Sequence, residues 1–331
     1  MRILMVRLGA MGDVVQTLPA ARELRRRFPR AKIDWAVDAH WADLLIGNPH
    51  IDQVIRVPMR ALRKRDSPLA AARKALGLIG GLRKSRFDIA FDFQGLIKSA
   101  ALASMSGASR TVGFSRESLR EPAAEVFYSR RASTSMRHVV DRYRDLASPG
   151  SGASPPNSSA FPLPDGGPLG ALPGRYVLAS PQAGWGSKQW PPEYYAELAT
   201  LLLREFGIPL LADFALGQEH RARVIRSIAA EGSVVPHSST ILGLISATRR
   251  ATAVVGVDSG PMHLAAALDR PGVAIFGPTE PRRNGPRSPL IEVIRAPGAL
   301  TTYKRDAQPS PSMLACAPRT VLSVLAPILA R

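Results

Sequence analysis

Two aspartates stand directly after apolar, strand-like runs and directly before helical patterns. Asp13 follows the run 3–6 and a glycine-containing turn, and Asp258 follows the run 253–257. A carboxylate in such a turn is presented at the carboxyl end of a parallel strand, which is the edge where open α/β sheets bind ligands. Asp13 could act there as a general base, and Asp258 could hold a ligand hydroxyl. Alternatively, both residues only cap the helices that follow them.

The second half of the chain also carries residues suited to phosphate. Ser259 and Gly260 follow Asp258, and Pro261 suits the first turn of a helix because its missing N–H costs nothing there. The free N–H groups and the dipole of this helix favour an anion. Lys188 lies in a glycine-containing loop before another predicted helix, where a lysine and backbone N–H groups suit a diphosphate. A lysine on the surface of a loop is the alternative interpretation.

Other site chemistries find little support. The six histidines show no paired metal-ligand spacing, and His263 alone on a helix is typical of a packing residue, so no metal site is predicted. The loop before Lys188 lacks the full P-loop pattern, and the chain has no Gly-x-Ser-x-Gly elbow for a serine nucleophile. Cys316 is the one cysteine, which excludes an intrachain disulfide and favours a reducing compartment.

The elements that must position these residues form two successive series of strands and helices. Apolar runs alternate with helical patterns in each series, which predicts an α/β fold with two doubly wound sheets and a cleft faced by both sets of strand ends. A stretch rich in Ser, Pro and Gly separates the series. The predicted parts are a Rossmann-like domain at 1–150, a linker at 151–174, a second Rossmann-like domain at 175–315 and a C-terminal helix in 316–331. One placement of that helix is back on the first domain.

The composition and net charge of the chain indicate which class of binding partner it has. With 331 residues, 45% of them hydrophobic, the chain is predicted to be globular. A formal net charge of +18 predicts an anionic partner, which could be nucleic acid, an anionic lipid surface or a phosphorylated substrate. Arg60, Arg63 and Lys64 belong to a dense basic cluster that favours an anion site. No signal peptide or membrane-spanning run is found, so we expect a cytoplasmic chain whose membrane contact is peripheral.

Several short motifs occur one after another along the chain. They are 11–14 (Met-Gly-Asp-Val), 92–99 (Asp-Phe-Gln-Gly-Leu-Ile-Lys-Ser), 113–114 through 120–122 with 127–128, 188–191 (Lys-Gln-Trp-Pro), 257–260 (Val-Asp-Ser-Gly) with His263, and 267–271 with 277–279. Together they resemble the ADP-heptose:lipopolysaccharide heptosyltransferases, glycosyltransferase family 9, and the resemblance covers essentially the whole chain. It is strongest to the members that add the first heptose to the inner core. The resemblance implies a GT-B fold and an inverting transfer. Because the residues suit electrostatic handling of a diphosphate, we expect the reaction to need no metal or other cofactor.

The resemblance also implies roles for individual residues. Asp13 would be the general base that deprotonates the acceptor hydroxyl, and Lys188 would offset charge on the diphosphate leaving group. The residues expected to bind the donor, ADP-heptose, are Lys188, Glu219 (at its ribose), Asp258, Ser259, Gly260 and His263. The residues expected to hold the phosphates and carboxylates of the Kdo-lipid A acceptor are Arg60, Arg63, Lys64 and Arg120. The chain would then work at the inner face of the inner membrane.

Three alternatives stay open at this point. One is a family 9 transferase with another nucleotide-sugar or acceptor. A second is a nucleotide-sugar epimerase, which can share the architecture but needs further carboxylates or histidines between its domains. The third is a basic, non-enzymatic protein that binds nucleic acid or membrane. Nucleic acid is disfavoured because no platform of aromatic and basic residues is visible.

Overall fold

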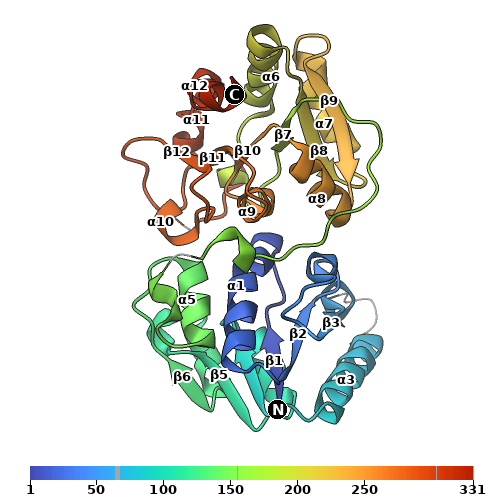
Figure 1. The fold of residues 1–331 in the computed structure, drawn as a ribbon, viewed down its shortest axis with the longest axis vertical. Helices are drawn as coiled ribbons and strands as arrows, with labels where there is room; N and C mark the ends of the chain where they lie inside the picture. Colours follow the sequence, from blue (N-terminus) through green and yellow to red (C-terminus); the bar gives the residue numbers. More distant parts are fainter. Residues whose placement is uncertain (64–67, 155, 303, 331) are drawn as a thin grey trace. The chain divides into compact units, whose positions relative to one another are not determined.

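The computed structural model describes residues 1–63, 68–154, 156–302 and 304–330. The chain divides into two units, Met1–Pro164 and Asp165–Arg331. Each unit contains one six-stranded sheet, whose neighbouring strands all run parallel. Helices flank the sheet in each unit (Figure 1). The central strands are continuous apolar runs because both of their faces are covered.

In the first unit the strand order is β3-β2-β1-β4-β5-β6. The strands are β1 (Arg2–Val6), β2 (Lys32–Asp38), β3 (Gln53–Val57), β4 (Ile89–Asp92), β5 (Arg110–Phe114) and β6 (Arg130–Ala132). The helices are α1 (Met11–Arg27), α2 (Met59–Arg63), α3 (Pro68–Lys84), α4 (Ile97–Met105) and α5 (Val139–Ala147), with 3-10 turns η1 (Ala42–Leu45), η2 (Arg116–Ser118), η3 (Pro122–Phe127), η4 (Ser151–Ala153) and η5 (Ser158–Ala160). The direction of winding reverses between β1 and β4, which makes their carboxyl ends the switch point where such sheets bind ligands.

The second unit repeats this order as β12-β11-β10-β7-β8-β9, so its switch point lies between β7 and β10. The strands are β7 (Val177–Ser180), β8 (Leu210–Ala215), β9 (Val234–Ser239), β10 (Ala253–Val257), β11 (Gly272–Phe276) and β12 (Ile291–Arg295). The helices are η6 (Gly186–Lys188), α6 (Pro192–Phe206), α7 (Glu219–Ile228), α8 (Ile241–Arg250), α9 (Gly260–Ala267), α10 (Pro281–Asn284), α11 (Pro311–Leu314) and α12 (Pro318–Leu329). Among the helices of both units that the structure describes, none has the length and apolar character to cross a membrane.

The boundary between the units differs from the predicted one. The sequence predicts that the first domain ends at residue 150, whereas the first unit extends to Pro164. The Nδ2 group of Asn48 donates to the carbonyl of Pro162 at 3.1 Å, and Arg22 donates to the side chain of Asn157 at 3.2 Å. These bonds tie the first part of the predicted linker to the first unit.

The C-terminal helix α12 belongs to the second unit. Val321 and Leu325 are fully buried in the core of that unit, and α12 packs against α6 and the strands β10 and β11. The indole N–H of Trp190 donates to the carbonyl of Cys316 at 2.8 Å just before the helix begins. The sequence left open whether this helix packs on the first domain, and the structure places its apolar face in the core of the second.

Candidate functional site

Asp13 lies in the first turn of α1, next to the switch point of the first sheet. Its Oδ1 atom is 2.8 Å from Nη2 of Arg7, and its Oδ2 atom accepts a hydrogen bond of 2.9 Å from the N–H of Ala10. The capping interpretation therefore holds in part, because this bond satisfies a free N–H at the start of the helix. The side chain is nevertheless 42% exposed, so the carboxylate can also reach a ligand.

The carboxylate of Asp13 is oriented by its ion pair with the buried Arg7. The residue is only 5% exposed, its Nη1 group donates to the carbonyl of Phe93 at 2.6 Å, and its guanidinium lies 5.0 Å from the ring centroid of Tyr143. Burial lowers the pKa of the guanidinium, but the opposing effects of Asp13, then Tyr143 and then Asp92 outweigh it and raise the pKa overall. The sequence prediction missed Arg7, although a charged residue directly after a buried apolar strand is a usable signal.

Asp92 ties the turn after β4 to the turn after β1. The carboxylate is fully buried and accepts hydrogen bonds from Tyr128 Oη (2.7 Å), Ser99 Oγ (2.9 Å) and the N–H groups of Gln94 (2.8 Å) and Gly95 (3.3 Å). Burial raises the pKa of Asp92, and these donors oppose the shift by favouring the ionised form. The side chain of Gln94 in turn accepts the N–H of Leu8 at 2.9 Å. The turn that carries Asp13 is therefore braced by the turn after β4.

Replacing Tyr128 with Phe is expected to lower the free energy of unfolding by about 1–3 kcal/mol at neutral pH. The ring stays in place, but the buried Asp92 carboxylate loses a donor. Because the hydroxyl favours the ionised form, its loss raises the pKa of Asp92 further, and the cost is present above that pKa and lost as the pH falls through it. Urea unfolding at neutral and at acidic pH measures the effect. Tyr194→Phe is the control, since its hydroxyl bonds a carbonyl at the surface. A loss that does not change with pH would contradict the prediction.

The predicted acceptor residue Arg60 lies in α2, directly after β3, and is exposed. The pKa of His40, at the end of β2, is lowered by burial and next by the charge of Arg60. Arg60 therefore lies at the carboxyl edge of the first sheet. Arg63 is the last residue of α2, but the placement of its side chain is not described. Lys64 lies outside the described residues.

Arg120 is exposed in the segment between η2 and η3. The carboxylate of the next residue, Glu121, accepts the N–H of Ile97 at 2.8 Å, at the start of α4. This bond fixes the segment of Arg120 beside the turn that follows β4. Arg120 is thus also placed at the carboxyl edge of the first sheet, on the opposite side of β1 from Arg60.

Asp258 and Lys188 form an ion pair at the switch point of the second sheet. The Nζ atom of Lys188 is 2.6 Å from Oδ2 of Asp258, and the two side chains are 14% and 8% exposed. Thr279 donates its hydroxyl to the same oxygen at 2.7 Å, and the lysine Nζ lies 4.4 Å from the ring centroid of Trp185. The interpretation of Lys188 as a surface lysine is therefore wrong, because its ammonium group is held in a buried pair.

Ser259 precedes α9, and Gly260 is the first residue of that helix. The hydroxyl of Ser259 is buried, makes no capping bond and has no hydrogen-bond partner among the described residues. The carboxylate of Asp258 is directed to Lys188 and Thr279, so the interpretation of Asp258 as only a helix cap is wrong. His263 is buried on α9, with its Nε2 atom 3.9 Å from Oδ1 of Asp258. The start of α9 therefore offers a hydroxyl and N–H groups to an anion.

Glu219 begins α7, directly after the end of β8. Its Oε1 atom accepts hydrogen bonds from the N–H of Gly217 at 2.9 Å and from the hydroxyl of Ser238 at 3.0 Å. The N–H of Gly217 contributes most to lowering the pKa of Glu219, followed by its own N–H and then Ser238. The half-buried carboxylate is therefore an ionised acceptor, as a contact to ribose hydroxyls requires.

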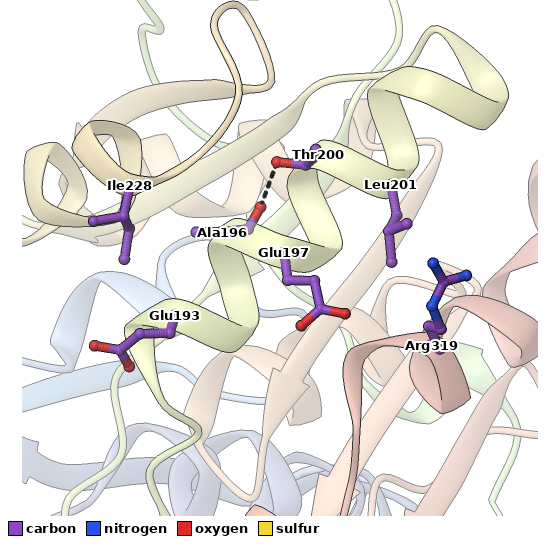
Figure 2. A pocket seen from close by; sticks show the side chains of 7 residues that line it. All are labelled: Glu193, Ala196, Glu197, Thr200, Leu201, Ile228 and Arg319. Carbon is purple, nitrogen blue, oxygen red and sulfur yellow. Dashed lines mark hydrogen bonds between the residues drawn. The ribbon is translucent and has the colours of Figure 1, made fainter.

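Within the described ranges, no three His, Cys, Asp or Glu side chains lie together so that they could hold a metal ion. The independence of the reaction from metal stays a prediction. A hollow of about 400 Å³ lies beside α6, as Figure 2 shows. The residues that line it are Glu193, Ala196, Glu197, Thr200, Leu201, Ile228 and Arg319. None of the predicted site residues is among them.

Comparison with known proteins identifies the family. The model described as "Glycosyltransferase family 9 (heptosyltransferase)" matches residues 76–310. Lipopolysaccharide heptosyltransferase 1 of Escherichia coli (strain K12) is 34% identical over 304 residues, which cover 90% of this chain and 94% of that protein. The solved structure of E. coli heptosyltransferase WaaC with ADP has a TM-score of 0.80 and 28% identity, covering 99% of this chain and 100% of that one.

A second structure, WaaC with ADP-2-deoxy-2-fluoro heptose, has a TM-score of 0.76 and 30% identity over 99% of both chains. The two Rossmann-like units are therefore the domains of a GT-B fold, as the resemblance predicts. The family match covers both units, and the identity to the curated relative extends over most of the chain. The chain belongs to glycosyltransferase family 9, the heptosyltransferases.

Proposed function

We propose that the chain transfers heptose from ADP-heptose to the Kdo of the lipopolysaccharide inner core, with inversion at the anomeric carbon. Membership of the family supports sugar transfer over the epimerase and the non-enzymatic alternatives. The identity to lipopolysaccharide heptosyltransferase 1 over 90% of the chain supports this step of the inner core. The WaaC complexes with ADP and with a fluorinated ADP-heptose support the donor.

The contrast between the two switch-point aspartates carries the assignment of the base. The Asp13 side chain is 42% exposed and is oriented by Arg7 and by one backbone N–H. The Asp258 side chain is 8% exposed and is bound by a lysine and a threonine hydroxyl. A general base must reach the proton that it removes. Asp13 is therefore the base, and Asp258 is a residue of the donor site.

The proposed reaction is a single displacement. Asp13 takes the proton of a Kdo hydroxyl as its oxygen forms the new bond to the anomeric carbon of heptose. The bond between that carbon and the β-phosphate oxygen breaks on the opposite face of the sugar, and ADP leaves with both bonding electrons. The ammonium group of Lys188 and the N–H groups at the start of α9 stabilise the charge that develops on the diphosphate.

The remaining donor contacts follow from the same geometry. The unsatisfied hydroxyl of Ser259 and the backbone of Gly260 lie at the start of α9, where phosphate oxygens would complete their hydrogen bonds. His263 supports Asp258 from the same helix. Glu219 accepts hydrogen bonds from the ribose hydroxyls, which suits its ionised carboxylate.

The acceptor side of the proposal rests on positive charge. Arg60 and Arg120 are exposed at the carboxyl edge of the first sheet, and Arg63 and Lys64 follow Arg60 in the sequence. Guanidinium and ammonium groups suit the phosphates and carboxylates of Kdo-lipid A. Because this acceptor is a lipid, we place the reaction at the inner face of the inner membrane, with peripheral contact to its anionic surface.

A direct assay tests this function. The chain is incubated with ADP-heptose and Kdo-lipid A in the presence of EDTA, and release of ADP is followed. We expect release that requires both substrates and does not respond to added magnesium. UDP-sugars and other ADP-sugars serve as donor controls. Release with one of these donors but none with ADP-heptose would overturn the donor assignment and favour a different family 9 transferase.

A further inference from the structure

The outward side of α3 carries an apolar stripe that no part of the fold requires. Leu69 and Leu76 are 83% and 70% exposed, and their spacing of two helical turns places them on one side of the helix. Leu82 is 2% exposed and packs into the core from the opposite side, together with Leu78. Figure 1 shows α3 at the margin of the first unit. Exposed leucines alone are ordinary on a protein surface, so the charges that surround these two decide what the stripe can bind.

The charged residues of α3 are all positive. Arg73, four positions after Leu69 and three before Leu76, lies between the leucines and is exposed. Further exposed cations on the helix are Lys74, Arg83 and Lys84. No Asp or Glu occurs from residue 67 to residue 87. Helices exposed only to water commonly carry both signs of charge, so a stripe of leucines and cations indicates an anionic surface with an apolar interior.

Glycines leave the outer side of the helix open. A Cβ atom added at Gly77, Gly80 or Gly81 would meet nothing within 4 Å. Gly80 continues the stripe one turn beyond Leu76. The glycines leave the backbone of the second half of α3 uncovered between the basic side chains. A flat partner can therefore approach this backbone closely.

We propose that this side of α3 is the surface by which the enzyme docks on anionic phospholipid. Leu69 and Leu76 enter the boundary between headgroups and acyl chains, and Arg73 and Lys84 contact lipid phosphates. A second copy of the chain fits poorly, because a two-fold dimer would bring two identical basic stripes together on chains of net charge +18. The inference rests on the proposed function in one respect: the docked helix brings the enzyme to a lipid acceptor.

Sedimentation with vesicles tests the proposal on the full chain without donor or acceptor. Vesicles of phosphatidylglycerol and phosphatidylethanolamine are compared with vesicles of phosphatidylcholine. We expect binding to the anionic vesicles to weaken at least about tenfold when Leu69 and Leu76 are both changed to Glu, and roughly fivefold for each cation removed in Arg73→Gln with Lys84→Gln. The matched control is Leu300→Glu, since Leu300 is also 83% exposed but lies in the second unit.

Turnover on a deacylated, water-soluble acceptor separates docking from chemistry, and the docking variants should keep the wild-type rate. Thermal unfolding confirms that the variants fold, as expected for exposed positions. Equal vesicle binding by the wild type and the double Glu variant would overturn the proposal. So would a change in oligomeric state without a loss of vesicle binding, because the stripe would then serve a second copy. Failure of the transferase assay with intact vesicle binding would instead reject the proposed function alone.

Discussion

The Asp13→Asn variant is expected to bind ADP-heptose as well as the wild type does and to turn over about 10²- to 10⁴-fold more slowly. An amide cannot take the proton of the acceptor hydroxyl, so the step that generates the nucleophile loses its base. The amide fits the space of the carboxylate, and its oxygen can still accept the N–H of Ala10. The measurement is kcat from ADP release, with donor binding followed by calorimetry.

Asp43 provides a matched control for this substitution. Its side chain is 39% exposed and pairs with Arg56 at 2.9 Å in the same unit, much as Asp13 pairs with Arg7. Asp43→Asn should leave kcat unchanged. A wild-type rate for Asp13→Asn, or an equal loss in Asp43→Asn, would show that Asp13 is not the base.

Lys188→Met is expected to cost both rate and stability. The rate should fall about 10²- to 10³-fold, because the charge on the departing diphosphate loses a preorganised cation. The free energy of unfolding should fall by about 3 kcal/mol, since Asp258 is left as a buried carboxylate without its partner. Single-turnover kinetics and urea unfolding measure the two effects separately.

Adding Asp258→Asn to Lys188→Met separates the two roles of the lysine. The double variant buries a neutral amide beside the hydroxyl of Thr279, so most of the stability should return while the rate stays low. Lys188→Arg, which keeps the positive charge, should retain more activity than either. Recovery of the rate together with stability would mean that Lys188 acts only by holding the structure together.

Positions with a strong local pattern were predictable from the sequence. Asp13 and Asp258 each follow an apolar run and precede a helix, and the structure places both at switch points. The long-range partners could not be read in this way. Lys188 lies in the segment after β7 and Asp258 follows β10, so their pairing is not encoded by any local pattern.

Four strands escaped prediction, and three of them share a place in the fold. The fourth, β5, is an inner strand, and the sequence from residue 112 onwards predicts a charged loop in its place. β6, β9 and β12 each lie at an edge of a sheet, and their sequences, Arg-Arg-Ala, Val-Val-Pro-His-Ser-Ser and Ile-Glu-Val-Ile-Arg, are polar or interrupted. An edge strand is only partly covered, so it needs no continuous apolar run. These segments lack the continuous apolar run by which a central strand is predicted. They are recognised as strands only by their pairing with a neighbouring strand.

Each sheet is formed by one continuous stretch of the sequence, which affects how the chain folds during synthesis. All six strands of the first sheet come from Met1–Pro164, and the last helix, α12, packs within the second unit. Nothing synthesised late is needed to complete the first sheet. At typical ribosome speeds the first unit has on the order of ten seconds to fold while the second is still being translated. The apolar parallel strands of the first unit can thus be buried before those of the second leave the ribosome, which limits mispairing between two sheets of the same strand order.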